Sequence, residues 1–273
     1  MDKLRSMPEL KKPMVEEEIM SKRAFISTGI EKLDSLLEGG LQKGFTTLIS
    51  GVPGSNLEII TKQIATAEKV VYITTEESED EIISTMKRFS WDTSDIEFVD
   101  IASRHLNHIL EGESKRISIY EQRSKNKLKE LIKSGSEGMP PSIKSPEDYL
   151  AVLSHNVRMH ASSKIIVNSL DFFLNRYRHE DMLKALQAAK AIVADKKGAF
   201  IIILTRGIHG DEIERKLELL ADCVLELDVL QKGTTFERLL TVKKVRNYAK
   251  KIGTARYDIT DTGFMLETIE RIL

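Results

Sequence analysis

The stretch LISGVPGSNLEII, residues 48–60, decides the fold of this chain. An apolar strand runs into Gly51, a turn containing Pro53 and Gly54 follows, and an apolar helical pattern comes next. A strand, a glycine-containing turn and a helix in this order are typical of the phosphate-binding loop G-x-x-x-x-G-K-[ST]. The stretch therefore predicts an α/β domain with such a loop at the carboxyl end of one strand.

Strand and helix patterns alternate along the rest of the chain. Strands are predicted at 46–50, 70–74, 96–100, 164–170, 198–205 and 222–229, and helices at 57–69, 80–89 and 179–195. This alternation favours a mostly parallel, twisted sheet flanked by helices, and the absence of polar alternation predicts strands buried on both faces. The runs 236–246 and 255–260, with the FMLET that follows, predict antiparallel strands that close the sheet at its C-terminal end.

The domain organisation follows from the same patterns. We interpret residues 1–24 as a charged N-terminal arm and residues 25–273 as a single domain. A basic insertion at about 103–146 interrupts the domain, and we predict one amphipathic helix over 118–133 and mobile chain for the rest. The insertion could contact nucleic acid, but it holds only Tyr120 for base stacking, which favours a solvated loop or a partner-binding helix.

The composition restricts the class of protein. The chain has 273 residues, of which 41% are hydrophobic, enough for the core of one large domain. It has no run of roughly 20 apolar residues and no apolar leader, so we expect a cytoplasmic protein. A formal net charge of −1 gives the molecule no field that attracts nucleic acid or anionic lipid. Cys223 is the single cysteine and the histidines lack partners at ligand spacing, so we expect no disulfide and no metal site.

The loop departs from its pattern at the end. Asn56, Leu57 and Glu58 stand where the pattern has glycine, lysine and a hydroxyl residue. In the pattern the lysine reaches the β- and γ-phosphates and the hydroxyl holds Mg²⁺, and neither Leu57 nor Glu58 can do this. Because a lost charge-assisted hydrogen bond costs roughly 1.5–3 kcal/mol, we expect nucleotide affinity at least about a hundredfold lower. Lys62 lies one helical turn further along and is expected to point elsewhere.

The departing residues suggest another occupant for the loop. Ser55, Asn56, Leu57 and Glu58 fit the capping-box pattern S-x-x-E, in which Ser55 and Glu58 each accept from the other's amide. On this hypothesis the Glu58 carboxylate takes the place of phosphate at the helix N-terminus. The nucleotide-binding positions of this degenerate loop are Gly51, Pro53, Gly54, Ser55, Asn56, Leu57 and Glu58.

Three separated segments carry a resemblance to a known family. They are STGIEKLDSLLEGGLQKGFTTLISGVPGS at 27–55, YITTEESEDEIISTMKRFSWD at 72–92 and KIIVNSLDFFL at 164–174. In this order they resemble the KaiC-like branch of the RecA/RadA superfamily of ATPases, over residues 26 to 264. The resemblance implies a RecA-like P-loop NTPase core and an ancestral site for ATP and Mg²⁺.

The resemblance also assigns roles to residues after two strands. Glu76 and Glu77 match the family's catalytic pair, in which a carboxylate orients and deprotonates water. They also suit the acidic first turn of a helix, and we favour that structural interpretation. Asn168 falls on the family's Walker B aspartate and cannot contribute charge to a metal shell. Asp171 is expected to cap the turn after the strand rather than to bind metal.

Lys244 and Arg246 match a K-x-R element that, in the family, reaches across a subunit interface to the neighbour's nucleotide. Residues two apart on a strand point to the same face, so the spacing suits joint use. A solvated charged edge strand explains the pair equally well, and both interpretations stay open. At an interface without nucleotide, the cations could pair with Glu58 and Glu76 of the next subunit.

The sequence and the resemblance together favour a RecA-like domain inactivated at its nucleotide site. The expected role is a structural or regulatory subunit that associates with copies of itself or with an active paralogue and needs no cofactor. One alternative is an atypical ATP-binding protein or weak ATPase that binds ATP or ADP with Mg²⁺ and uses Glu76 and Glu77. The other is a nucleic-acid binding recombinase paralogue that works through the insertion.

Overall fold

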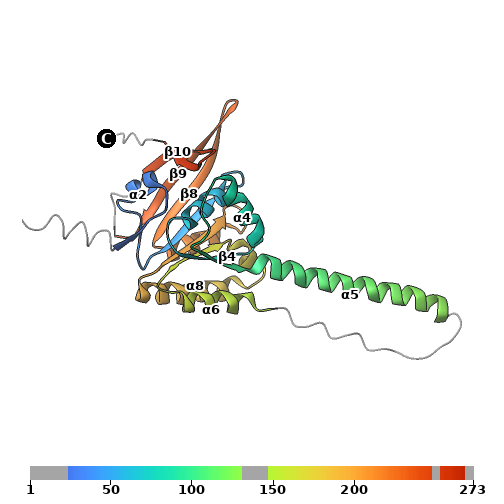
Figure 1. The fold of residues 1–273 in the computed structure, drawn as a ribbon. Helices are drawn as coiled ribbons and strands as arrows, with labels where there is room; N and C mark the ends of the chain where they lie inside the picture. Colours follow the sequence, from blue (N-terminus) through green and yellow to red (C-terminus); the bar gives the residue numbers. More distant parts are fainter. Residues whose placement is uncertain (1–23, 131–146, 248–252, 268–273) are drawn as a thin grey trace, which may run out of the picture.

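The computed structural model describes residues 24–130, 147–247 and 253–267. Within these ranges the chain forms a nine-stranded sheet with helices on both faces, and one long helix projects from the body (Figure 1). The strand order is β11-β10-β9-β8-β3-β7-β6-β4-β5. The predicted α/β class, with a mostly parallel sheet and closing antiparallel strands, is confirmed.

The parallel part of the sheet positions the loop. It consists of β8 Cys223–Lys232, β3 Thr46–Gly51, β7 Ala199–Thr205, β6 Lys164–Asn168, β4 Val70–Thr74 and β5 Ile96–Asp100. The antiparallel strands are β9 Thr235–Val245, β10 Gly253–Thr260 and β11 Gly263–Leu266. Because parallel strands run in one direction, the ends of β3, β7, β6 and β4 meet along one side of the sheet, called here the carboxyl edge.

Burial along the strands follows their place in the sheet. Every residue of β3, β4 and β6 is buried, as the apolar runs predicted. The prediction that 96–100 is also buried on both faces is wrong. β5 is the edge strand, and of its residues only Val99 is buried. β5 pairs with β4 on one side and has no neighbouring strand on the other side among the described residues, so the sequence of β5 keeps polar residues such as Glu97.

Helices cover both faces of the sheet and bury a separate apolar cluster on each. One face carries α2 Glu31–Leu36, α3 Leu57–Ala65 and α4 Glu79–Arg88. The other carries α6 Tyr149–Met159, α7 Asp171–Leu174, α8 His179–Lys196 and α9 Asp211–Leu220. The short strands β1 Phe25–Ile26 and β2 Leu41–Gln42 pair with each other on either side of α2 in the sequence. The described helices therefore complete a three-layered domain around β3.

The insertion begins as part of a long helix. α5 runs from Ile101 to Glu130 and extends away from the sheet and helices (Figure 1). The predicted helix is thus confirmed over 118–130, and it begins earlier than predicted, directly after β5. The rest of the insertion, residues 131–146, and residues 1–23 of the predicted arm lie outside the described residues.

Candidate functional site at the carboxyl edge

The loop between β3 and α3 keeps the backbone of a phosphate-binding loop. Gly54 has φ of +85° and Asn56 has φ of +57°, both in the left-handed region. Asparagine is among the few residues that enter this region with little strain, so Asn56 holds the conformation that the pattern assigns to glycine. A Cβ at Gly51 would collide with the Ser55 hydroxyl, which explains the first glycine. Asn56 therefore keeps the left-handed backbone at the glycine position although its side chain differs.

The capping box predicted between Ser55 and Glu58 is wrong. α3 begins at Leu57, its N-cap is Asn56, and no side chain caps the helix. The helix starts at residue 57 as predicted, but its N-cap is the left-handed Asn56 instead of Ser55, and Ser55 Oγ is buried without a hydrogen-bond partner. Glu58 instead accepts from Asn56 Nδ2 at 3.4 Å. A complete capping box occurs at the start of α4, between Ser78 and Glu81.

Lys62 is brought into the site from the far end of α3. Its Nζ lies 2.5 Å from Glu77 Oε2, and its side chain is 1% exposed against 32% for Glu77. Lys62 therefore ends at the acidic pair after β4, whereas the sequence predicted only that it points away from a phosphate. A buried lysine needs a paired acceptor, and Glu77 is the acceptor that the fold supplies.

Glu76 is held from the neighbouring strand. Ser169, directly after β6, donates its hydroxyl to Glu76 Oε1 at 2.5 Å. Glu76 is exposed along its length, but its carboxyl end lies against Ser169. Desolvation of that end raises the pKa of Glu76, and the nearby carboxylates of Asp171 and Glu77 add to the rise. Both members of the acidic pair thus have partners within the chain.

Asn168, at the Walker B position, lies at the carboxyl end of β6 and faces β4. Its Nδ2 donates to the Tyr72 hydroxyl at 2.9 Å, and both side chains are buried. Burial, with Glu77 close by, raises the pKa of Tyr72 and keeps the phenol neutral. An aspartate at position 168 could not donate to that oxygen, so the amide suits this pairing.

Asp171 connects β6 to the loop after β7. Its two carboxylate oxygens accept from the Thr205 amide at 3.2 and 3.1 Å, and Oδ1 lies 2.7 Å from His209 Nε2. Both side chains are almost fully buried, with 7% of Asp171 and 3% of His209 exposed. Asp171 is the first residue of α7, whose N-cap is Leu170. Asp171 was predicted to cap the turn after β6. Instead its carboxylate accepts hydrogen bonds from the Thr205 amide and so links the end of β6 to the end of β7.

Lys244 and Arg246 both have partners within the chain. Lys244 Nζ donates to the carbonyls of Glu218, Leu219 and Ala221, at 2.9, 3.2 and 2.6 Å, and so caps the C-terminus of α9. Arg246 pairs with the buried Asp222 at 3.0 Å, and 52% of its side chain stays exposed. Lys244 lies near the end of β9 and Arg246 directly after it, and both contact the segment 218–222 between α9 and β8. Their interface role stays a prediction.

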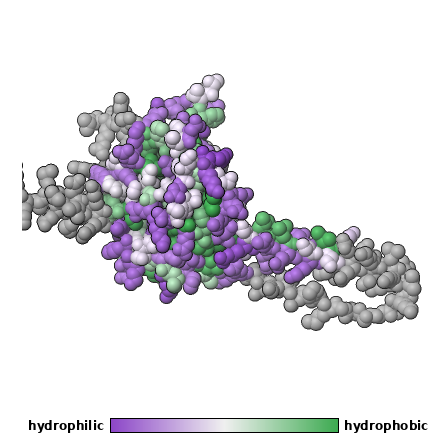
Figure 2. Space-filling view, in the orientation of Figure 1, coloured by the Kyte–Doolittle hydropathy of each residue, from purple (hydrophilic) through white to green (hydrophobic). Residues whose placement is uncertain are grey.

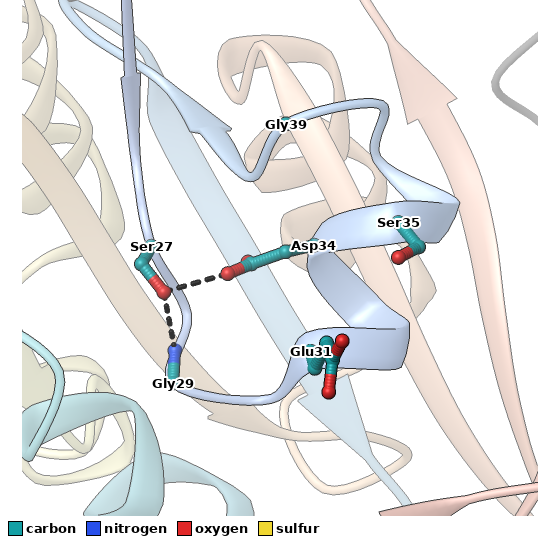
Figure 3. Close-up of a pocket in the computed structure, with 6 residues that line it drawn as sticks. All are labelled: Ser27, Gly29, Glu31, Asp34, Ser35 and Gly39. Atoms are coloured by element: carbon teal, nitrogen blue, oxygen red, sulfur yellow. Dashed lines mark hydrogen bonds between the residues drawn. The ribbon is translucent and has the colours of Figure 1, made fainter. Parts of the chain in front are cut away.

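A pocket of about 450 Å³ lies beside the segment that leads into β3. Figure 3 shows Ser27, Gly29 and Asp34 pointing toward one another at its wall. Asp34 accepts from the Ser27 hydroxyl at 2.6 Å and from the Thr28 amide and hydroxyl at 2.8 and 2.6 Å. Asp34 therefore stabilises the loop that precedes α2, and both of its carboxylate oxygens already accept hydrogen bonds within the chain.

The sequence analysis named Lys62 without its partner Glu77, and four further site residues escaped it: Tyr72, Ser169, His209 and Tyr257. Tyr72 carried a usable signal, because its hydroxyl is a polar group inside the apolar run VVYIT. Tyr257 carried none, since its hydroxyl donates to the Ser55 carbonyl at 2.6 Å across 202 positions of sequence. Contacts between distant strands, such as this one, have no local pattern.

Two general searches of the described residues bear on the site. No group of three or more His, Cys, Asp or Glu side chains there is arranged to hold a metal ion. Among the same residues, no helix has the length and apolar character needed to cross a membrane.

Comparison with known proteins agrees with the geometry. The sequence model of a family described as "ATPase: KaiC" matches residues 26–270. A UPF0273 protein of Thermotoga maritima is 21% identical over 248 residues, covering 88% of this chain and 95% of the relative. One from Pyrococcus furiosus is 23% identical over 252 residues, covering 88% and 93%.

Two further matches concern the fold and one segment. The crystal structure of a KaiC-like protein from Pyrococcus horikoshii superposes with a TM-score of 0.62 at 17% identity, covering 89% of this chain and 99% of that chain. The DNA repair protein RadA of Aquifex aeolicus is 44% identical over 66 residues, which is 23% of this chain and 15% of the relative. The fold thus recurs in a solved KaiC-like protein.

Proposed function

The chain belongs to the KaiC family of ATPases, and from this premise we propose that it is a non-catalytic member that serves as a structural or regulatory subunit. In this role it associates with copies of itself or with an active paralogue. The observation that carries the proposal is the ion pair between Lys62 and Glu77. A carboxylate that is to activate water must face the substrate, and Glu77 is committed to a buried lysine of its own chain.

The loop itself supports the same role. Leu57 stands at the lysine position and packs against the apolar cluster on the α3 face, and Glu58 stands at the hydroxyl position. Neither supplies a cation to the β- and γ-phosphates. Burial raises the pKa of Tyr72, and the carboxylates of Glu77, Glu76 and Glu58 raise it further, so all three act electrostatically on one side chain at this end of the sheet. An anionic nucleotide meets negative charge there, where the pattern offers lysine.

Calorimetry with ATP and ADP, with and without Mg²⁺, tests the proposal. We expect no heat of binding at millimolar nucleotide and no release of phosphate. Rebuilding the loop with Asn56→Gly, Leu57→Lys and Glu58→Thr should recover some binding and little hydrolysis, because Glu77 stays paired and Asn168 adds no charge to a metal shell. Tight binding of ATP by the unchanged protein would overturn the proposal.

One observation favours an atypical ATP-binding protein as the second candidate. The backbone of the loop is intact, with Gly54 and Asn56 in the left-handed region, and backbone amides alone can bind phosphate. If phosphate release occurs, Glu76→Gln and Glu77→Gln should abolish it, whereas Glu81→Gln, in the capping box of α4, should not. Release that survives both substitutions would remove the acidic pair from this alternative.

A further inference from the structure

Helix α5 carries large apolar side chains that no described part of the chain covers. The exposed fractions are 55% for Leu106, 45% for Ile109, 53% for Leu110, 58% for Ile117 and 74% for Tyr120. Figure 2 shows apolar surface along this projecting helix, beyond the body of the domain. Scattered apolar residues on a surface are ordinary, but five on 15 consecutive residues of one helix form a patch.

The spacing of these residues identifies the kind of surface. Leu106, Leu110, Ile117 and Tyr120 fall on one row with intervals of four and three, and Glu113 occupies the position between them. Intervals of four and three put residues on a single narrow side of a helix, the arrangement by which one helix packs along another. A surface of this shape fits a second helix.

The root of α5 is fixed to the domain, so the row is held in a constant direction. His105 lies edge-on to Tyr149 and Phe172, with ring centroids 5.9 and 5.2 Å apart. Arg176 contacts His105 Nε2 at 3.1 Å and lies 5.0 Å over the Phe172 ring. These contacts come from α6 and from the region around α7, and they anchor the first turns of α5.

The charge of the outer half of α5 selects the partner. Residues 115–130 contain six Lys and Arg and two Glu, a formal charge of +4 in a chain whose total is −1. A second copy of α5 would bring the same positive charge alongside, which disfavours pairing between two such helices. A partner helix with acidic residues beside its own apolar row is attracted by the same charges.

We propose that α5 is a docking helix for an acidic amphipathic helix of another protein. The apolar row from Leu106 to Tyr120 packs against the partner's apolar row, and Lys115, with the other basic residues of the outer half, draws its carboxylates. Arg116 pairs with Glu113 at 2.9 Å. A lipid surface is the less suitable occupant because the row is narrow and contains Glu113. The inference does not depend on the nucleotide site, and it stands whether or not the protein binds ATP.

A synthetic peptide tests the docking surface directly. The probe is a fluorescent helical peptide with leucine at intervals of four and three and glutamate at the flanking positions, and binding to the full chain is followed by anisotropy. We expect a Kd of roughly 1–100 µM, the range of a small transient interface, and weaker binding as salt is raised. A peptide with lysine in place of each glutamate should not bind.

Neighbouring substitutions separate the apolar row from the rest of the helix. Ile117→Asp places a charge in the row and should weaken binding by about tenfold or more, while Ser118→Asp adds the same charge on another side and should weaken it far less. Both residues are exposed, so circular dichroism should show an intact fold for both variants.

Four results would overturn the proposal. They are no binding of the acidic peptide, equal loss with Ile117→Asp and Ser118→Asp, equal binding of the lysine peptide, and a preference for another occupant. The last is tested with vesicles of anionic phospholipid, with duplex DNA and by light scattering for pairing between copies. A tighter interaction in any of these that Ile117→Asp removes identifies the wrong class of partner.

Discussion

At the scale of the residue, the Lys62–Glu77 pair shows how one side chain can redefine a site. Lys62 is almost completely enclosed, and Glu77 is its charged partner at 2.5 Å. The enclosed charge depends on that partner, since a buried cation without one is costly. Glu77 depends on Lys62 less, because a third of it reaches solvent. The pair is therefore asymmetric in energy.

This asymmetry predicts unequal effects of substitution on stability. Glu77→Ala leaves Lys62 buried without a charge partner and should cost toward the lower end of the roughly 3–5 kcal/mol seen when a buried pair loses one member. Lys62→Met keeps the apolar volume and lets Glu77 turn to water, so it should cost less. Urea unfolding of both single variants and of the double variant measures the difference. A larger loss for Lys62→Met than for Glu77→Ala would contradict the account.

A second buried lysine predicts a dependence on pH. Burial lowers the pKa of Lys164 to about 8, against the partial opposition of Glu68 and Asp34, and its Nζ donates to the Ile64 carbonyl at 2.7 Å. In the unfolded chain the pKa is about 10.4, so between these values the unfolded state binds more protons. The free energy of unfolding should therefore rise with pH in this window, by at most about 1.4 kcal/mol per unit.

Urea unfolding at several pH values from about 7 to about 10 measures that rise. Lys164→Met removes the titrating group and is the control, because other lysines and tyrosines titrate in both proteins. The two curves should converge as the pH increases, with the unchanged protein gaining stability relative to the variant. Parallel curves over this range would mean that Lys164 titrates normally in the folded protein.

At the scale of the element, two helices that follow the carboxyl edge begin in different ways. α4 begins with a complete capping box, in which Ser78 accepts from the Glu81 amide and the Glu81 carboxylate accepts from the Ser78 amide. α3 begins at the left-handed Asn56, without a side-chain cap. Ser78→Ala should therefore cost about 0.5–2 kcal/mol.

The matched substitution at α3 is Glu58→Ala. It should change stability by no more than about 0.5 kcal/mol, because Glu58 is exposed and caps no amide of the helix. Thermal unfolding of both variants compares the two helix starts. A loss at Glu58 equal to that at Ser78 would restore the capping box that the sequence suggested for the loop.

Elements with strong local patterns were predicted well. The run VVYIT, residues 70–74, is a strand with those bounds, and the helix predicted at 179–195 extends from His179 to Lys196. The helices α2, α6 and α9 were missed. Each is short, six to eleven residues, so a helix of this length depends on packing against the sheet as well as on its own sequence.

At the scale of the whole molecule, the open question is association between copies. Arg246 is the candidate interface cation, since half of its side chain is exposed, whereas all three protons of Lys244 are used by the end of α9. We expect light scattering to show self-association that Arg246→Ala weakens. Arg215→Ala, on the exposed side of α9, is the control and should have no effect. A monomer at high concentration, unchanged by either substitution, would contradict this expectation.

The sequence by itself determined the architecture and the departure from the phosphate-loop pattern. The α/β class with a mostly parallel sheet follows from the alternation of apolar runs and helical patterns, and Leu57, Glu58 and Asn168 are visible without any coordinates. Such features depend on residues close together in the chain, whose periodicity records which face is buried. The left-handed backbone conformation of Asn56 could be predicted only from its place in the pattern, where a glycine normally stands.

The tertiary structure alone decided how the residues of the site are paired. Ser169 meets Glu76 and Asn168 meets Tyr72 because β6 and β4 are parallel neighbours, and Lys62 meets Glu77 because α3 packs on the same sheet. From the sequence alone, the same side chains could equally have pointed toward a bound nucleotide. Spacing along the chain does not fix distances between residues on different strands. Burial selects among these pairings, because an enclosed charge or amide must have a partner and only the folded chain shows which one is within reach.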